Sequence, residues 1–186
     1  MSPDSFGTPA TQQRTSLDRF ALRFPAIVRR ISATWPRLRA GSNLTLGQFR
    51  AAFLAGNEAF NRGDFAAAFA TLAPDCEWHS VAYATERVLF GPDQVCRFFE
   101  EEIFGMFRGW RSEPVHFLQA GDGVFVVLLS GHGTGSVSGA PVHLDLSEAW
   151  ELRGGVPVRV QEFPTWEEAL TVAGLNPSSA GELRRS

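Results

Sequence analysis

The sequence contains no lysine, and all 17 of its basic side chains are arginine. This absence excludes a Schiff-base lysine, a pyridoxal-phosphate anchor and the lysine of a phosphate-binding loop. Cysteine is scarce as well: Cys76 and Cys96 form no C-x-x-C pair and no zinc-ligand spacing, and two free thiols fit a reducing compartment. No apolar run reaches the roughly 18 residues of a membrane span, and the start lacks a signal-peptide pattern. We therefore expect a cytoplasmic protein that uses no metal and no bound cofactor.

The net charge of −3 conceals an uneven distribution. Residues 1–44 carry seven arginines against two acids, a net of +5, whereas residues 45–186 carry ten arginines against 18 acids, a net of −8. The overall acidity argues against a nucleic-acid partner. A basic segment on an acidic domain instead predicts contact with an acidic surface, including that of the domain itself.

The basic segment is predicted to be a helical arm. Residues 1–16 are polar and are expected to be disordered, whereas residues 17–44 carry apolar side chains at helical steps of three and four. Three interpretations remain open for this amphipathic arm: packing on its own acidic domain, an interface with a partner, or adsorption to an anionic membrane surface. Packing on the domain is favoured over the membrane, because the acidic surface belongs to the same chain.

The remaining sequence places helices before strands, an order typical of α+β domains. After Gly109 the apolar period drops from 3.6 to two, which predicts an antiparallel meander. Residues 82–90 and 131–140 are expected to be loops, and residues 176–186 a flexible tail. The predicted helices cover 45–62, 65–72, 91–106 and 165–173, and the predicted strands cover 76–81, 110–119, 124–130, 141–152 and 156–163.

Several short motifs, in this order and spacing, resemble a SnoaL-like domain of the nuclear-transport-factor-2-like superfamily over about residues 45–175. They are Phe60-Asn61-Arg62-Gly63-Asp64-Phe65, Leu72-Ala73-Pro74-Asp75, Glu77-Trp78-His79, Gly91 with Val95-Cys96-Arg97-Phe98-Phe99, Glu148-Ala149-Trp150-Glu151-Leu152-Arg153-Gly154-Gly155, Glu167-Glu168-Ala169-Leu170 and Gly174-Leu175. The resemblance implies a curved antiparallel sheet wrapped by about three helices into a cone with a central apolar pocket. It also implies a homodimer formed through the sheet. Members include ketosteroid isomerase, epoxide hydrolases, dehydratases, polyketide cyclases and binding proteins, so the fold alone does not select a function.

Glu148 is the first candidate for chemistry because of strand parity. One face of the strand over 142–152 is apolar except for Glu148, which predicts a carboxyl that points into the core. Desolvation raises the pKa of such a carboxyl and favours the neutral acid, a hydrogen-bond donor at neutral pH. By resemblance, Glu148 falls where ketosteroid isomerase has its protonated aspartate. The alternatives are a structural carboxyl held by an arginine or a backbone amide, or a bulge that turns the side chain outward.

His79 is the candidate base, with Glu77 on the same strand face to orient it. A strand-end histidine satisfied by the backbone is the favoured alternative. The isomerase's base aspartate falls near His79 or Ser80, where this chain has no carboxylate, and the only tyrosine is Tyr83, in an expected loop. Two of the three isomerase roles therefore lack a matching residue.

Two further residues are secondary candidates. Glu162 shares strand parity with the apolar Val158 and Val160, which predicts an inward side chain, with a cross-strand ion pair as the alternative. His132 follows the apolar strand over 124–130. His116 and His143 are expected on the sheet surface.

Aromatic residues are the predicted wall of a pocket for a small apolar or aromatic molecule. Ordinary core packing is the alternative for most of them. The predicted lining residues are Phe53, Phe60, Trp78, Phe98, Phe99, Phe125 and Trp150.

Two functions are therefore weighed. The first is a small-molecule-binding protein that performs acid/base catalysis, as an isomerase, dehydratase or cyclase, with Glu148 as acid and His79 as base. The second is a non-catalytic ligand-binding or association module that dimerises through its sheet. An open, ligand-sized pocket with an acid and a base close together favours the first, and a cone filled by Phe and Trp favours the second.

Overall fold

The computed structural model describes residues 8–9, 44–81 and 87–183. The arm expected over 17–44 lies outside the described residues except for Leu44, which packs against the core. Of the segment expected to be disordered, the structure describes Thr8–Pro9 (β1), a two-residue strand beside Phe117 and His116.

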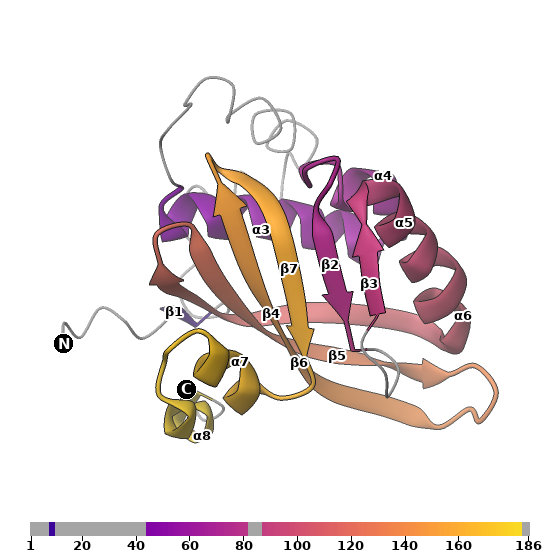
Figure 1. The fold of residues 1–186 in the computed structure, drawn as a ribbon. Helices are drawn as coiled ribbons and strands as arrows, with labels where there is room; N and C mark the ends of the chain where they lie inside the picture. The colour runs from indigo at the N-terminus through magenta and orange to yellow at the C-terminus, as the bar shows by residue number, and fades with distance from the viewer. Residues whose placement is uncertain (1–7, 10–43, 82–86, 184–186) are drawn as a thin grey trace.

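A single curved sheet of seven strands forms the framework, in the order β1-β4-β5-β6-β7-β2-β3 (Figure 1). All neighbouring strands are antiparallel except β2 and β7, which are parallel. The strands after β1 are β2 (Glu77–Ser80), β3 (Arg87–Phe90), β4 (Phe107–Gly121), β5 (Val124–Gly135), β6 (Pro141–Arg153) and β7 (Val156–Phe163).

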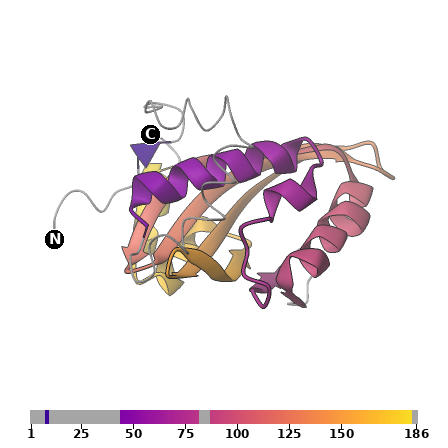
Figure 2. The same cartoon turned by 90° about the horizontal axis from the view of Figure 1, so that it is seen from above.

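Helices cover the inner face of this sheet, with the long helix α3 (Leu46–Asn61) lying across it (Figure 2). Thr45 caps α3 through a capping box with Gln48, as its position before the apolar repeat predicts. The chain then turns at Gly63, with φ of 76°, and continues through α4 (Phe65–Ala68). The helix predicted over 91–106 is continuous but changes geometry along its length: it comprises α5 (Gly91–Phe98), the π-helix η2 (Phe99–Ile103) and α6 (Phe104–Met106).

The core divides between the two faces of the sheet, as strand alternation requires. The inner face packs against α3, α5 and η2 through aromatic and branched side chains, among them Trp78, Val127 and Val160. The outer face at β4 and β5 carries Leu118, Val126 and Leu128 into a second apolar cluster. This arrangement confirms the predicted α+β cone.

The C-terminal segment covers that second cluster on the outer face of the sheet (Figure 1). It consists of α7 (Trp166–Val172), η3 (Pro177–Ser179) and α8 (Ala180–Leu183). The expectation of a flexible tail from residue 176 therefore does not hold for the helical residues 177–183, because Ala180 and Leu183 are buried against the sheet. We name α7, η3 and α8 the C-terminal cap.

His116 also lies under the C-terminal cap rather than on the surface that the sequence predicted. Its side chain is buried, its Nε2 lies 2.8 Å from the carbonyl oxygen of Leu183, and its ring meets the edge of Trp166. Burial lowers the pKa of His116, since the charged imidazolium is poorly solvated there. The predictions for His116 and for residues 177–183 fail for the same reason, because the C-terminal cap covers this part of β4.

The two segments expected to be loops, 82–90 and 131–140, each contain part of a β-strand. Arg87–Phe90, within the loop expected over 82–90, pairs with β2, and β5 runs on to Gly135 before the hairpin. Gly131 is necessary in that extension, because a Cβ there would lie 2.6 Å from the Trp110 ring. The described helices include none that is both long and apolar enough to cross a bilayer.

Candidate functional site

An open cavity of about 460 Å³ lies between the inner face of the sheet and the helices. Of the predicted aromatic wall, Phe53, Phe60, Trp78, Phe99 and Trp150 line this cavity. Phe98 and Phe125 do not line it. Phe98 is buried against Phe99, and Phe125 is stacked on Phe49 with ring centroids 4.4 Å apart. The cone is therefore hollow, and these two residues contribute to the packing of its walls.

Glu148 points into this cavity from the middle of β6, as strand parity predicted. The Trp150 indole N–H donates a 2.8 Å hydrogen bond to its Oε2. The accessible part of Glu148 faces the apolar cavity, which hydrates a charge poorly. Burial, and secondarily the charge of Glu162, raise the pKa of Glu148 to about 8 against the opposing effect of the indole N–H.

Glu162 lines the same cavity from β7 and is held by three donors. The Trp78 indole N–H donates to Oε1 at 2.9 Å, and Ser80 Oγ and the Val81 backbone N–H donate to Oε2 at 2.7 and 3.1 Å. Burial raises the pKa of Glu162, whereas all three hydrogen bonds favour its carboxylate form. Its two oxygens act as acceptors in every one of these contacts.

The two carboxyls form one unit, because Glu148 and Glu162 are direct partners in the β6–β7 register. Directly opposed residues of an antiparallel pair have Cβ atoms roughly 5 Å apart and point to the same face. Two carboxylates this close in an apolar cavity repel each other, so each one disfavours the ionised form of the other. Three donors stabilise the carboxylate form of Glu162, whereas Glu148 has a single donor.

The two indoles that donate to the carboxyls are themselves fixed by aromatic packing in the cavity wall. The rings of Trp78 and Trp150 meet edge to face, with centroids 5.6 Å apart and planes at 85°. Phe69 and Phe99 flank Trp78, and Phe53 flanks Trp150, at centroid distances between 5.3 and 5.6 Å. This packing fixes both indole N–H groups in the direction of the carboxyls.

His79 lies on the outer face of the sheet, because the larger, apolar Trp78 occupies the inward position on β2. Its Nε2 is 3.3 Å from the Oε2 of Glu77, so the expected contact between these two side chains is present. Both residues are nevertheless absent from the cavity wall. The structure therefore does not bring His79 and Glu148 together in one cavity, and the carboxyl that lies beside Glu148 there is that of Glu162.

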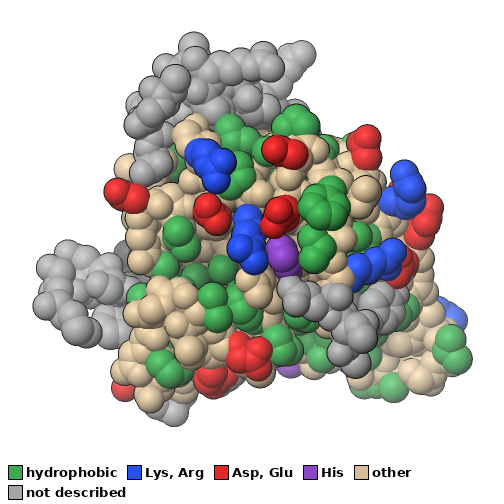
Figure 3. Space-filling view, viewed as in Figure 1, with side chains coloured by type: hydrophobic (Ala, Val, Ile, Leu, Met, Phe, Trp, Pro, Cys, Tyr) green, Lys and Arg blue, Asp and Glu red, His purple; other side chains and the backbone are tan. Residues whose placement is uncertain are grey.

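The outer face of β7, β2 and β3 carries many charged side chains (Figure 3). Glu77 is the register partner of the exposed Arg159, and acidic and basic side chains lie side by side over β7, β2 and β3. His132 also lies outside the cavity lining: it is partly exposed on β5, 4.0 Å from the Glu113 carboxylate. Within residues 8–9, 44–81 and 87–183, no group of three or more His, Cys, Asp or Glu side chains is arranged to hold a metal ion.

Sequence reasoning did not identify the donors that hold the carboxyls. The sequence predicts Trp78 and Trp150 only as apolar wall and assigns no role to Ser80. The signal that could have found them is the spacing of two residues between Trp78 and Ser80 and between Glu148 and Trp150. Residues two apart on a strand point to the same face, so each of these donors shares a face with a carboxyl.

The comparisons with known proteins agree with this architecture. Residues 52–160 match the SnoaL-like domain. Similar solved structures include an NTF2-like protein of unknown function from Burkholderia pseudomallei, with 23% identity, coverage of 70% of this chain and 98% of that chain, and a TM-score of 0.55. A hypothetical protein with a ketosteroid isomerase-like fold from Catenulispora acidiphila, in complex with trimethylamine, has 15% identity, coverage of 66% of this chain and 91% of that chain, and a TM-score of 0.52.

A third similar structure is SalBIII, described as an epoxide hydrolase/cyclase-like enzyme in pyran ring formation, with 19% identity, coverage of 62% and 90%, and a TM-score of 0.50. The search of curated proteins finds no match. At these identities the structural likeness establishes the fold alone, whereas the domain match spans more than half of the chain. The chain therefore belongs to the SnoaL-like domain family.

Proposed function

We propose that the protein is an acid/base enzyme of the isomerase, dehydratase or cyclase type that acts on a small apolar or aromatic molecule. The observation that carries this proposal is the Glu148–Glu162 pair at the wall of an open aromatic cavity. The charged residues among the described lining are Asp145, Glu148 and Glu162, so the wall described there supplies no cation to neutralise the pair. Retention of one proton by the pair follows from that environment.

The proposed roles follow from the hydrogen bonds. The Trp150 N–H occupies Oε2 of Glu148, so Oε1 carries the proton and donates it to an oxygen of the substrate. The Glu162 carboxylate, fixed by its three donors, accepts a proton from the substrate or stabilises the positive charge that develops there. The two carboxyls supply this chemistry themselves. The SnoaL-like family and its fold include isomerases and cyclases, which suits the proposal.

Deuterium incorporation tests this proposal without knowledge of the natural substrate. Small alicyclic ketones are incubated with the protein in D₂O, and exchange at the carbon beside the carbonyl is followed by ¹H NMR. We expect exchange above the buffer rate, and a loss of at least about 100-fold in Glu148→Gln and in Glu162→Gln, the usual size of an acid/base contribution. Glu151→Gln is the matched control, because Glu151 is an exposed glutamate on the same strand as Glu148.

The alternative, a non-catalytic binding module, gives a different outcome. Ketones that bind in the cavity without exchange above the buffer rate would contradict catalysis and leave ligand binding as the function. Native mass spectrometry of the purified protein would then identify the molecule that the cavity retains.

A further inference from the structure

The cavity has a second polar position, away from the carboxyl pair, at Ser112 on β4. Ser112 lies in register with Gly131 of β5, which pairs with Leu144 of β6, whereas Glu148 is four residues further along β6. Four residues of strand correspond to a rise of about 13 Å. The two polar positions therefore face different parts of the same cavity.

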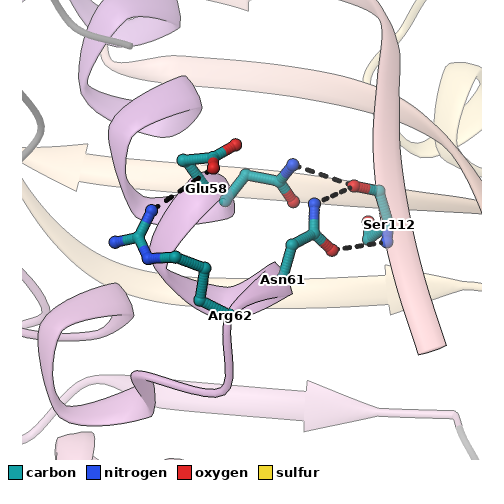
Figure 4. A network of polar contacts seen from close by, with 5 residues as sticks. Glu58, Asn61, Arg62 and Ser112 are labelled. Atoms are coloured by element: carbon teal, nitrogen blue, oxygen red, sulfur yellow. Dashed lines mark hydrogen bonds and ion pairs between the residues drawn. The ribbon is translucent and has the colours of Figure 1, made fainter. Parts of the chain in front are cut away.

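The backbone of Ser112 is held rigidly by α3. Asn61 donates from Nδ2 to the Ser112 carbonyl oxygen at 2.9 Å and accepts from the Ser112 N–H at 2.8 Å (Figure 4). Asn57 donates from its own Nδ2 to the same carbonyl oxygen at 2.9 Å. These three bonds fix β4 against the helix, and none of them uses the hydroxyl of Ser112.

Two polar atoms at this position remain available to a ligand. Ser112 is only 7% exposed, it lines the cavity, and within the described residues its Oγ has no hydrogen-bond partner. The Ser112 carbonyl oxygen can only accept a hydrogen bond, so the Asn57 side chain must present its Nδ2 to it. Asn57 also lines the cavity, and its Oδ1 has no hydrogen-bond partner in the described part of the chain. The Ser112 hydroxyl is open to the cavity, where the hydroxyl of a ligand can complete its hydrogen bonding.

We propose that Ser112 and Asn57 form a hydroxyl-binding subsite, so that the substrate is an apolar molecule with a hydroxyl group remote from the atom that Glu148 protonates. The Ser112 O–H would donate to the ligand hydroxyl, and Asn57 Oδ1 would accept from it. A hydroxyl is the simplest neutral group that both accepts and donates at one atom. This inference rests on the proposed function, because the subsite would bind the end of the substrate that lies away from Glu148 and Glu162.

The test compares 2-tetralol with tetralin, which differ only by the hydroxyl, using isothermal titration calorimetry. We expect the wild-type protein to bind 2-tetralol about tenfold more tightly than tetralin, and Ser112→Ala to reduce that preference to near unity. This substitution leaves the backbone bonds to Asn57 and Asn61 in place, so the fold is expected to persist. Ser130→Ala, on the neighbouring strand and outside the cavity lining, is the control and should retain the preference.

Glu148→Gln distinguishes failure of this inference from failure of the proposed function. A preference that survives in Glu148→Gln and disappears in Ser112→Ala supports the subsite. A preference that disappears in Glu148→Gln and survives in Ser112→Ala would place the hydroxyl on the carboxyl pair and overturn the subsite, while the proposed acid/base role would stand. Equal affinity of the wild type for the two probes would also overturn the subsite.

Discussion

Glu148→Gln is expected to stabilise the protein at alkaline pH and to flatten the dependence of its stability on pH. The pKa of Glu148 is about 8 in the folded protein, against 4.5 for an ordinary glutamate. Between these values the folded state keeps a proton that the unfolded state releases, so the folded state binds more protons. The free energy of unfolding therefore falls as pH rises through this interval.

The size of this effect is large for one residue. A difference of one bound proton changes the folding equilibrium by about tenfold per pH unit, so the wild type should lose a few kcal/mol between about pH 5 and pH 8. Full stability is present below the unfolded pKa, and the loss is complete above the folded one. The amide of Glu148→Gln does not titrate, so the variant does not lose this stability as the pH rises.

Urea denaturation at a series of pH values from 5 to 9 measures this effect. The variant should be less stable than, or equal to, the wild type at pH 5 and more stable at pH 9. Glu151→Gln should retain the slope of the wild type. A parallel pair of curves for Glu148→Gln and the wild type would mean that Glu148 ionises in the folded protein as readily as in the unfolded chain.

Trp166→Ala is expected to lower the free energy of unfolding by about 3 to 5 kcal/mol, the usual range for loss of a large buried aromatic side chain. Trp166 is 3% exposed, lies against His116, and its indole N–H donates to the Leu129 carbonyl oxygen at 3.4 Å. It is one of the cap residues that pack against the outer face of the sheet.

The same substitution should disturb the site, because the C-terminal cap follows directly on β7. Only Phe163, Pro164 and Thr165 separate Glu162 from Trp166, and the Thr165 carbonyl oxygen accepts a 2.9 Å bond from Ser147 Oγ beside Glu148. Urea denaturation of Trp166→Ala measures the stability effect, with Val172→Ala, an exposed position on the same helix, as control. A loss below 1 kcal/mol, similar to that of Val172→Ala, would show that the cap contributes little to stability.

The sequence predicted those features that depend on local periodicity. The capping residue Thr45, the α+β order and the inward direction of Glu148 follow from neighbouring residues alone. The inward direction of Glu162 follows from the same parity. What no local pattern contains is the register that places Glu148 opposite Glu162, because register depends on pairing between distant segments.

The errors have related physical causes. Strand parity places His79 and Trp78 on opposite faces but does not say which of them faces inward. Trp78 faces inward because a large apolar side chain prefers the core. The C-terminal residues are polar in sequence, and the few apolar positions that bury against the sheet, Ala180 and Leu183, are too widely spaced to predict a helix. Covering of the sheet by the C-terminal cap then explains why His116 is buried.

The central claim is that the Glu148–Glu162 pair retains one proton at neutral pH. The most direct measurement is a ¹³C NMR titration of protein labelled at the glutamate side-chain carboxyl carbon, for the wild type, Glu148→Gln and Glu151→Gln. We expect one carboxyl resonance to titrate with a midpoint near pH 8, to be missing from Glu148→Gln and to be retained in Glu151→Gln. A wild-type spectrum in which every glutamate carboxyl is already ionised at pH 7 would contradict the account.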